Sequence, residues 1–112
     1  IECMTKYRGS LEIIAAIVRV IGEREGEGAK KTHVMYGANL SYTLVSRYLD
    51  WVVRAGLVGT VRGSRSLYRV TAKGRKFLER YEEFSERREE LQERMDMVEG
   101  ERAELENMCS FE

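Results

Sequence analysis

The sequence predicts an α+β fold that is mostly helical, with three short helices, a two-stranded hairpin and one long C-terminal helix. Apolar residues recur at helical spacing in successive segments separated by glycines, and short β-rich runs follow the third segment. The chain has 112 residues, 43% of them apolar and none of them proline. This length and composition suit about one domain with a modest core.

The sequence marks the ends of the three short helices. Ser10 is expected to be the N-cap of a first helix of about 13 residues, which ends in the glycine-rich stretch GEREGEG. A second helix is expected over residues 31–36, starting at the first or second of these and stopping at Gly37. Ser41 is expected to cap a third helix that ends at Gly56.

A hairpin and a long helix complete the predicted chain. The runs LVGTVRG and SLYRVT flank Gly63-Ser64, a composition typical of a two-stranded hairpin, here with a basic tip. Strong helix formers dominate from Thr71 to about Asn107, which predicts one long helix. We therefore expect an N-terminal domain of residues 1–72 and a C-terminal helix within residues 73–112.

The formal net charge of +0 hides a strong asymmetry along the chain. Residues 1–70 carry eleven bases and six acids, a net charge of +5, whereas residues 71–112 carry eight bases and thirteen acids, a net charge of −5. The window 26–76 has ten bases and two acids, a net charge of +8. This local excess predicts a polyanionic partner; a solvated basic surface without a partner is the alternative.

The second and third predicted helices have the spacing of a helix-turn-helix, whose second helix enters the major groove of duplex DNA. With Val45, Leu49 and Val52 facing inward, the outward face of the third helix consists of Ser41, Tyr42, Thr43, Ser46, Arg47, Asp50 and Arg54. Arginine holds a guanine edge through two hydrogen bonds, and short hydroxyls allow close approach to bases and phosphates. Asp50 is expected to pair with Arg54 instead of reading a cytosine.

The run LSYTLVSRYLDWVVRAGLV followed by YRVTAKGRKFL resembles the archaeal winged helix-turn-helix proteins. In that family a recognition helix ends in Gly-Leu-aliphatic, a β wing follows, and a Tyr-x-aliphatic-Thr-x-Lys-Gly segment opens the last helix. Residues 8–108 are similar to the small crenarchaeal ten-kilodalton "a" chromatin proteins. The resemblance implies a winged helix-turn-helix that binds double-stranded DNA as a homodimer, with the long C-terminal helices paired in an antiparallel coiled coil.

The resemblance also implies which residues contact DNA. It places the third helix in the major groove, the wing tip against the backbone or minor groove, and Lys30 and Lys31 at a phosphate-contacting position. His33, beside them, is either a further donor to DNA or a capping residue. The predicted DNA-binding residues are Lys30, Lys31, Thr32, His33, Ser41, Tyr42, Thr43, Ser46, Arg47, Arg62, Ser64 and Arg65. Arg62 and Arg65 have no acid nearby and suit phosphates, unless the tip is an exposed loop without function.

A strict 4-3 spacing in the C-terminal part predicts the seam of a coiled coil. Eight of its ten residues are apolar: Phe77, Tyr81, Phe84, Arg88, Leu91, Met95, Val98, Arg102, Leu105 and Cys109. Arginines at seam positions set register and orientation at a cost in stability. A helix packed on its own domain is the alternative, but a segment ~50 Å long overshoots a domain of ~70 residues.

The two cysteines distinguish parallel from antiparallel pairing of these helices. In a parallel pair Cys109 faces its own copy, close enough for a disulfide. In the antiparallel pair that the resemblance implies, the two copies of Cys109 lie at opposite ends, and Cys3 of the other chain becomes the candidate mate. Free thiols are the expected state, because intracellular disulfides are rare outside hyperthermophiles.

No residue pattern supports catalysis, a cofactor or a metal site. The sequence has one His, no Cys/His pair at metal spacing, and no nucleophile with an evident base. No apolar run approaches the roughly 18 residues of a membrane span. We therefore expect a cytoplasmic, nucleoid-associated DNA-binding protein that acts on chromatin or transcription and is not an enzyme. The alternatives are a ligand- or redox-responsive transcriptional regulator of the same fold and a protein-binding winged helix.

Overall fold

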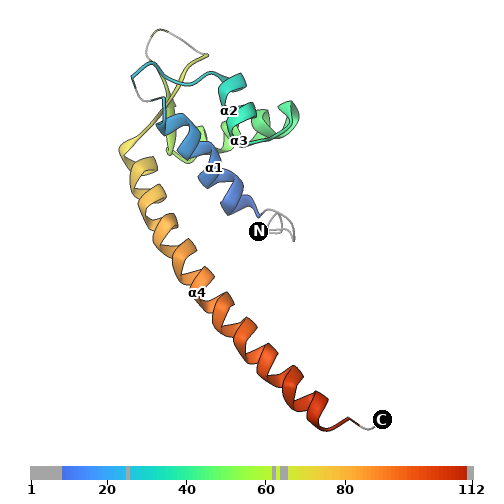
Figure 1. Ribbon diagram of the computed structural model, residues 1–112. Helices are drawn as coiled ribbons and strands as arrows, with labels where there is room; N and C mark the ends of the chain where they lie inside the picture. Colours follow the sequence, from blue (N-terminus) through green and yellow to red (C-terminus); the bar gives the residue numbers. More distant parts are fainter. Residues whose placement is uncertain (1–8, 25, 62, 64–65, 111–112) are drawn as a thin grey trace. The chain divides into compact units, whose positions relative to one another are not determined.

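The computed structural model describes residues 9–24, 26–61, 63 and 66–110, and it shows the predicted order of elements (Figure 1). The elements are α1 (Ser10–Gly22), α2 (Lys31–Gly37), α3 (Tyr42–Arg54), β1 (Val58–Thr60), β2 (Tyr68–Val70) and α4 (Ala72–Met108). The mostly helical α+β fold is thereby confirmed. The chain forms two compact units, one ending at Glu79 and one starting at Arg80; the predicted functional division at residues 72 and 73 stays a prediction.

Helix α1 begins at Ser10, one residue earlier than an N-cap at that position would allow. The N-cap is Gly9, whose N–H donates to the Glu12 carboxylate at 3.2 Å. Ser10 is buried, and its Oγ lies 3.0 Å from the hydroxyl of Tyr48 on α3. The prediction of Ser10 as N-cap is wrong because Gly9 occupies the N-cap position, and the Ser10 hydroxyl reaches across the core to Tyr48.

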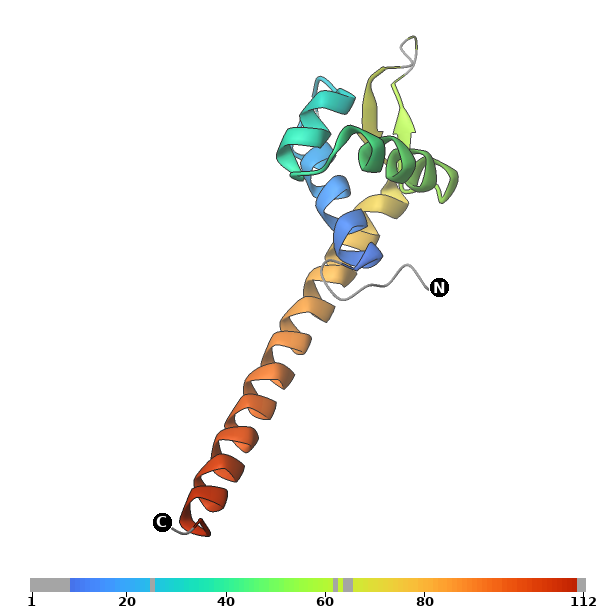
Figure 2. The same cartoon turned by 90° about the vertical axis from the view of Figure 1, so that its right-hand side faces the viewer.

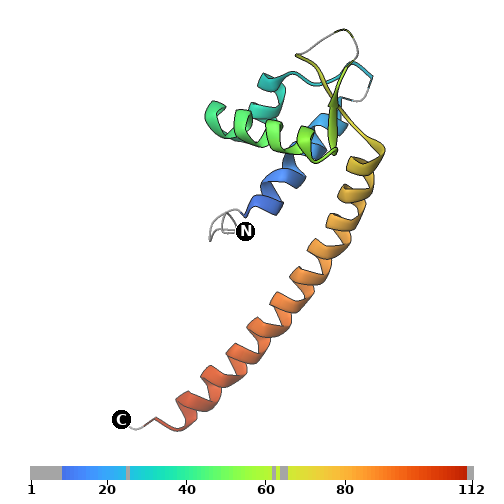
Figure 3. The same ribbon diagram turned by 180° about the vertical axis from the view of Figure 1, so that it is seen from behind.

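Buried residues of α1 and α3, the blue and green helices of Figure 3, make up most of the core of the first unit, and Val34 of α2 and Val58 of β1 join them. Ile17, Val18 and Ile21 of α1 are almost fully buried, as are Val45 and Val52 of α3. Fully burying a side chain of this kind contributes roughly 1.5–3 kcal/mol. The packing therefore holds α3 firmly by one face and leaves its polar face outward.

Helix α3 is capped by Ser41 as predicted, and it ends at Arg54, two residues before the predicted end at Gly56. The Ser41 hydroxyl caps it by accepting a 3.2 Å hydrogen bond from the backbone N–H of Leu44. After its last residue, Gly56 adopts φ +82°, and the N–H of Leu57 donates to the carbonyl of Val52 at 3.0 Å. This is a Schellman motif, in which glycine takes the left-handed conformation at little steric cost.

The strands β1 and β2 form an antiparallel hairpin, the wing, with Val58 opposite Val70 and Thr60 opposite Tyr68 (Figure 2). Ala29, in the loop before α2, exchanges two backbone hydrogen bonds with Tyr68, at 2.9 and 2.8 Å. The start of α2 is thereby tied to the wing, although the two are far apart in the sequence.

Helix α4 follows directly after the wing and continues through Gly100 without a break. The Thr71 hydroxyl caps it by accepting a 3.0 Å hydrogen bond from the N–H of Gly74. Phe77 and Leu78 pack against the core of the first unit, so the start of the helix belongs to that unit. Neither α4 nor any other helix within the described ranges is long and apolar enough to span a membrane.

Gly74→Ala should lower the free energy of unfolding by about 1–3 kcal/mol, because overpacking a closed site costs this much. A Cβ at this position would lie 2.1 Å from the carbonyl oxygen of Leu57 and 2.8 Å from Cγ1 of Val70. Gly100→Ala is the matched control, since nothing lies within 4 Å of its added Cβ. That change should gain about 0.5–1 kcal/mol. Urea denaturation followed by circular dichroism measures both, and equal effects would contradict the close packing at Gly74.

Candidate nucleic-acid interface

Helices α2 and α3 form the predicted helix-turn-helix, joined by residues 38–41 (Figure 1). Asn39 in this turn adopts φ 56°, a left-handed conformation that asparagine tolerates better than most residues. The wing follows α3 after the Schellman motif. The chain therefore holds, in order, the elements with which a winged helix contacts duplex DNA.

The outward face of α3 is the polar stripe that the sequence predicted. Its exposed members are Ser41, Tyr42, Thr43, Arg47, Asp50 and Arg54, and Ser46 is half-buried. Asp50 and Arg54 form an ion pair of 3.3 Å, as predicted. Arg47 has no hydrogen-bond or ion-pair partner in the described part of the chain. Arg47 is therefore the arginine of this stripe whose guanidinium is free for a ligand.

Lys30 and Lys31 are neighbours in the sequence but have different environments. Lys30 is exposed, and its ammonium has no partner among residues 9–24, 26–61, 63 and 66–110. Lys31 is half-buried: its Nζ donates to Ser46 Oγ at 3.1 Å and lies 4.8 Å from the centre of the Tyr42 ring. Lys31 thus ties α2 to α3, which leaves Lys30 as the more available cation.

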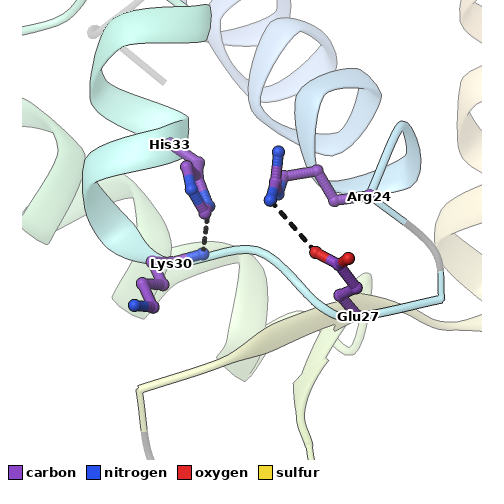
Figure 4. Close-up of polar contacts among 4 residues, drawn as sticks. All are labelled: Arg24, Glu27, Lys30 and His33. Carbon is purple, nitrogen blue, oxygen red and sulfur yellow. Dashed lines mark hydrogen bonds and ion pairs between the residues drawn. The ribbon is translucent and has the colours of Figure 1, made fainter.

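His33 caps the start of α2. Its Nδ1 accepts a 3.0 Å hydrogen bond from the backbone N–H of Lys30 (Figure 4). An imidazole nitrogen that accepts carries no proton, so Nε2 is the nitrogen left to donate. In the same view Arg24 Nη2 lies 3.2 Å from Glu27 Oε1, so this nearby cation is already paired.

A hollow of about 350 Å³ lies between the start of α2 and the wing. Lys30, Lys31 and Thr32 line one side, and Ser66 and Tyr68 line the other. Lys30 and Lys31, the predicted phosphate-contacting residues, therefore border a concave surface together with Ser66 and Tyr68.

Arg69 on β2 is a further candidate that sequence reasoning missed. It is exposed, it lies opposite Gly59 in the hairpin, and it has no partner within the described ranges. The alternation in SLYRVT indicates an exposed Arg69, because successive strand residues face opposite sides and Tyr68 and Val70 face the core. The predicted contacts Arg62, Ser64 and Arg65 lie outside the described residues. Gly63 between them adopts φ +84°, which suits a tight turn.

The predicted seam of α4 is largely exposed. Phe84 is 43% exposed, Leu91 57%, Met95 53%, Val98 60% and Leu105 62%. These side chains form an apolar stripe that remains exposed within the second unit, as a partner-binding helix requires.

The remaining seam residues have contacts within the chain or carry charge. Phe77 packs against the core of the first unit, and Tyr81 is half-buried with its ring centre 6.0 Å from that of Phe84. Arg88 lies over the Phe84 ring at 5.3 Å, and Arg102 pairs with Glu106 at 3.3 Å. Cys109 is an exposed free thiol, whereas Cys3 lies outside the described residues.

Comparison with known proteins agrees with this geometry. A sequence profile described as winged helix-turn-helix matches residues 7–89. An uncharacterized protein of Methanocaldococcus jannaschii is 32% identical over 78 residues, which are 69% of this chain and 74% of that protein.

Solved structures show the same fold. Sso10a-2, a DNA-binding protein from Sulfolobus solfataricus, matches with a TM-score of 0.69 and 28% identity over 94% of this chain and 100% of that one. MepR, a transcription regulator of the Staphylococcus aureus multidrug efflux pump MepA, matches with a TM-score of 0.61 and 16% identity over 91% and 78%. The resemblance to the crenarchaeal ten-kilodalton "a" proteins is thus confirmed, and the chain belongs to the winged helix-turn-helix family.

Proposed function

We propose that this protein binds double-stranded DNA as a homodimer, with α3 in the major groove and the wing against the backbone or minor groove. The supporting observation is the distribution of unpaired cations. Arg24 and Arg54 form ion pairs with carboxylates. The charged groups of Lys30, Arg47 and Arg69 have no hydrogen-bond or ion-pair partner in the described part of the chain. Unpaired cations before α2, on α3 and on the wing favour a polyanion that all of these elements contact.

The residues take different roles in this proposal. Arg47 reads a base edge, because its free guanidinium matches guanine, and Thr43 beside it permits a close approach. Lys30 and Arg69 bind phosphates, as do Arg62 and Arg65 at the wing tip. Lys31, Tyr42 and Ser46 support the position of α3, while Ser41, Thr32, His33 and Ser64 supply shorter polar contacts.

A chromatin or nucleoid-associated role in the cytoplasm fits the stripe better than sharp operator recognition. Because Asp50 holds Arg54, Arg47 is the unpaired arginine that remains among the described stripe residues. One good bidentate contact is worth about 1–3 kcal/mol of discrimination, so sequence preference should be modest. That Sso10a-2 is a DNA-binding protein and MepR a transcription regulator supports DNA as the partner in either role.

A ligand-responsive regulator is the second candidate, and one cavity favours it. A pocket of about 300 Å³ lies between the end of α1, β2 and the second turn of α4, with mostly apolar walls that include Val18, Ile21, Val70 and Leu78. This volume is at the lower end of small-molecule sites. An effector that bound there would change DNA affinity, which binding assays with and without candidate ligands would detect.

The proposed homodimer forms through the α4 seams, and the positions of the seam arginines support antiparallel pairing. In a parallel pair each seam residue faces its own copy, so Arg88 meets Arg88 and Arg102 meets Arg102, which is repulsive. An antiparallel pair in which Leu91 faces Met95 matches all ten seam positions: Phe77 with Cys109, Tyr81 with Leu105, Phe84 with Arg102, and Arg88 with Val98. Each arginine then packs its stem on an apolar partner.

Lys30→Ala should weaken binding about equally on all duplexes and lower the slope of log K against log salt by about one per winged domain, as loss of a phosphate contact does. Arg47→Ala should instead cost about 1–3 kcal/mol on the tightest duplex of a selected pool and less on random sequence. Fluorescence anisotropy across a salt series measures both quantities.

Arg19→Ala is the matched control for these variants, because it removes one exposed charge from α1, outside the helix-turn-helix and wing. Its salt slope should equal that of the wild type. Wild-type protein that shows no salt-dependent affinity for any duplex would refute the proposed function.

Arg88→Cys and Val98→Cys, each in a Cys3→Ser/Cys109→Ser background, should crosslink with each other after mixing and mild oxidation. In the antiparallel pair these positions face one another, whereas two copies of position 88 are about 15 Å apart along the axis. A disulfide requires α-carbons within roughly 7 Å. Non-reducing electrophoresis and mass spectrometry identify the products. Each variant oxidised alone is the control, and crosslinked Arg88→Cys homodimers would show parallel pairing.

A further inference from the structure

We infer that Thr71 and Lys73 are positioning residues that hold the recognition helix α3 at a defined angle to the wing. The inference rests on the proposed DNA-binding function. It concerns the wing junction, which we define as residues 55–57, between α3 and β1, together with residues 71–74, which follow β2 and include the first residues of α4.

Three successive backbone carbonyls after α3 are each bound by residues at the start of α4. The Ala55 carbonyl accepts from Lys73 Nζ at 2.8 Å, and the Gly56 carbonyl accepts from Thr71 Oγ1 at 2.5 Å. The Leu57 carbonyl accepts from the backbone N–H of Thr71 at 3.0 Å. Ala55 is the C-cap of α3, and Gly56 and Leu57 lie beyond it, so these bonds hold the segment that leaves α3 by residues that are distant in sequence.

The wing leaves and returns at this junction. Leu57 directly precedes β1, and Thr71 directly follows β2, so the bonds between them close the base of the hairpin. The Thr71 hydroxyl also accepts from the N–H of Gly74, which places one side chain between the end of α3 and the first turn of α4. The wing junction therefore joins three elements through two side chains.

The other parts of α3 are held by different contacts. Lys31 binds Ser46 in its first half, and Tyr48 binds Ser10 of α1 in its middle. Neither contact involves the wing. The angle between the C-terminal end of α3 and the wing thus depends on the wing junction and on the apolar packing beneath it.

This angle matters because α3 and the wing contact DNA at the same time in the proposed complex. A wing that moves relative to α3 must be ordered on binding, which costs conformational entropy and lowers affinity. Lys73 also places its positive charge at the negative end of the α3 dipole. Its ammonium is therefore occupied within the protein, unlike that of Lys30, and its removal should not resemble the loss of a phosphate contact.

The test compares Lys73→Met with Lys76→Met in the full-length chain, with a random-sequence 20-base-pair duplex as probe. Both changes remove one exposed charge from α4 and keep an unbranched side chain, but among the described residues the Lys76 ammonium has no hydrogen-bond or ion-pair partner. Lys73→Met should weaken binding about three- to tenfold relative to Lys76→Met, the factor that corresponds to a lost net hydrogen bond. The salt slopes of the two variants should be equal.

Thr71 supplies a second, uncharged test. Thr71→Val removes the hydroxyl and keeps the shape, so it should also weaken binding about three- to tenfold, whereas Thr71→Ser should bind like the wild type. Thermal denaturation establishes that each variant is folded at the assay temperature. If Thr71→Val does not fold, the comparison of Lys73→Met with Lys76→Met tests the inference alone.

Two results would overturn the inference while leaving the proposed function in place. One is that the wild type binds the duplex and that Lys73→Met and Lys76→Met bind it with equal affinity. The other is a salt slope for Lys73→Met that is smaller by about one per domain, because this would identify a direct phosphate contact. An absence of duplex binding by the wild type would instead refute the proposed function itself.

Discussion

The carbonyl of Leu57 joins the start of β1 to the start of α4 in the first unit. It accepts the N–H of Thr71, and it lies so near α4 that position 74 has no room for a Cβ. This approach explains the Thr-x-Lys-Gly spacing in physical terms. The threonine caps the helix through the residue that must be glycine, and the lysine between them reaches back to the end of α3. In the proposed complex the wing and the end of α3 are held at this contact, whereas the start of α2 is held by the Ala29–Tyr68 and Lys31–Ser46 hydrogen bonds.

Features that depend on local spacing were predictable from the sequence. Periodicity reports which face of a helix is buried, so Val45, Leu49 and Val52 were assigned inward and are buried. The Ser41 cap and the Asp50–Arg54 pair link residues three or four positions apart, and both are present. The resemblance to a known family added what spacing alone does not supply, namely the expected dimer and the expected phosphate-contacting position of Lys30 and Lys31.

Features that depend on contacts distant in sequence were not predictable. Ser10 is of a residue type that commonly caps helices, but its hydroxyl bonds to that of Tyr48, a residue 38 positions away. Adjacent positions in the sequence give Lys30 and Lys31 the same predicted role, yet Lys31 is the first residue of α2 and binds Ser46 across the turn of the helix-turn-helix. A hydroxyl or an ammonium satisfies either a nearby or a remote partner, and only the packing of the helices decides which of them is within reach.

If DNA is the partner, as proposed, the charge asymmetry limits the DNA contacts of one winged unit, and the exposed seam offers a way to join two units. Residues 71–112 have a net charge of −5, so phosphates repel the acidic helix and confine contact to the basic window with its net charge of +8. One winged unit then offers only a few phosphate contacts, and non-specific binding of this kind has dissociation constants of about 10⁻⁴–10⁻⁶ M at physiological salt. Joining two units makes the second binding event intramolecular and raises affinity about 10²–10⁴-fold without new contacts, provided that both units reach the duplex together. In the proposed complex a stable seam is therefore as necessary for DNA occupancy as α3 itself, and the repulsion between like arginines in a parallel pair favours the antiparallel orientation proposed above.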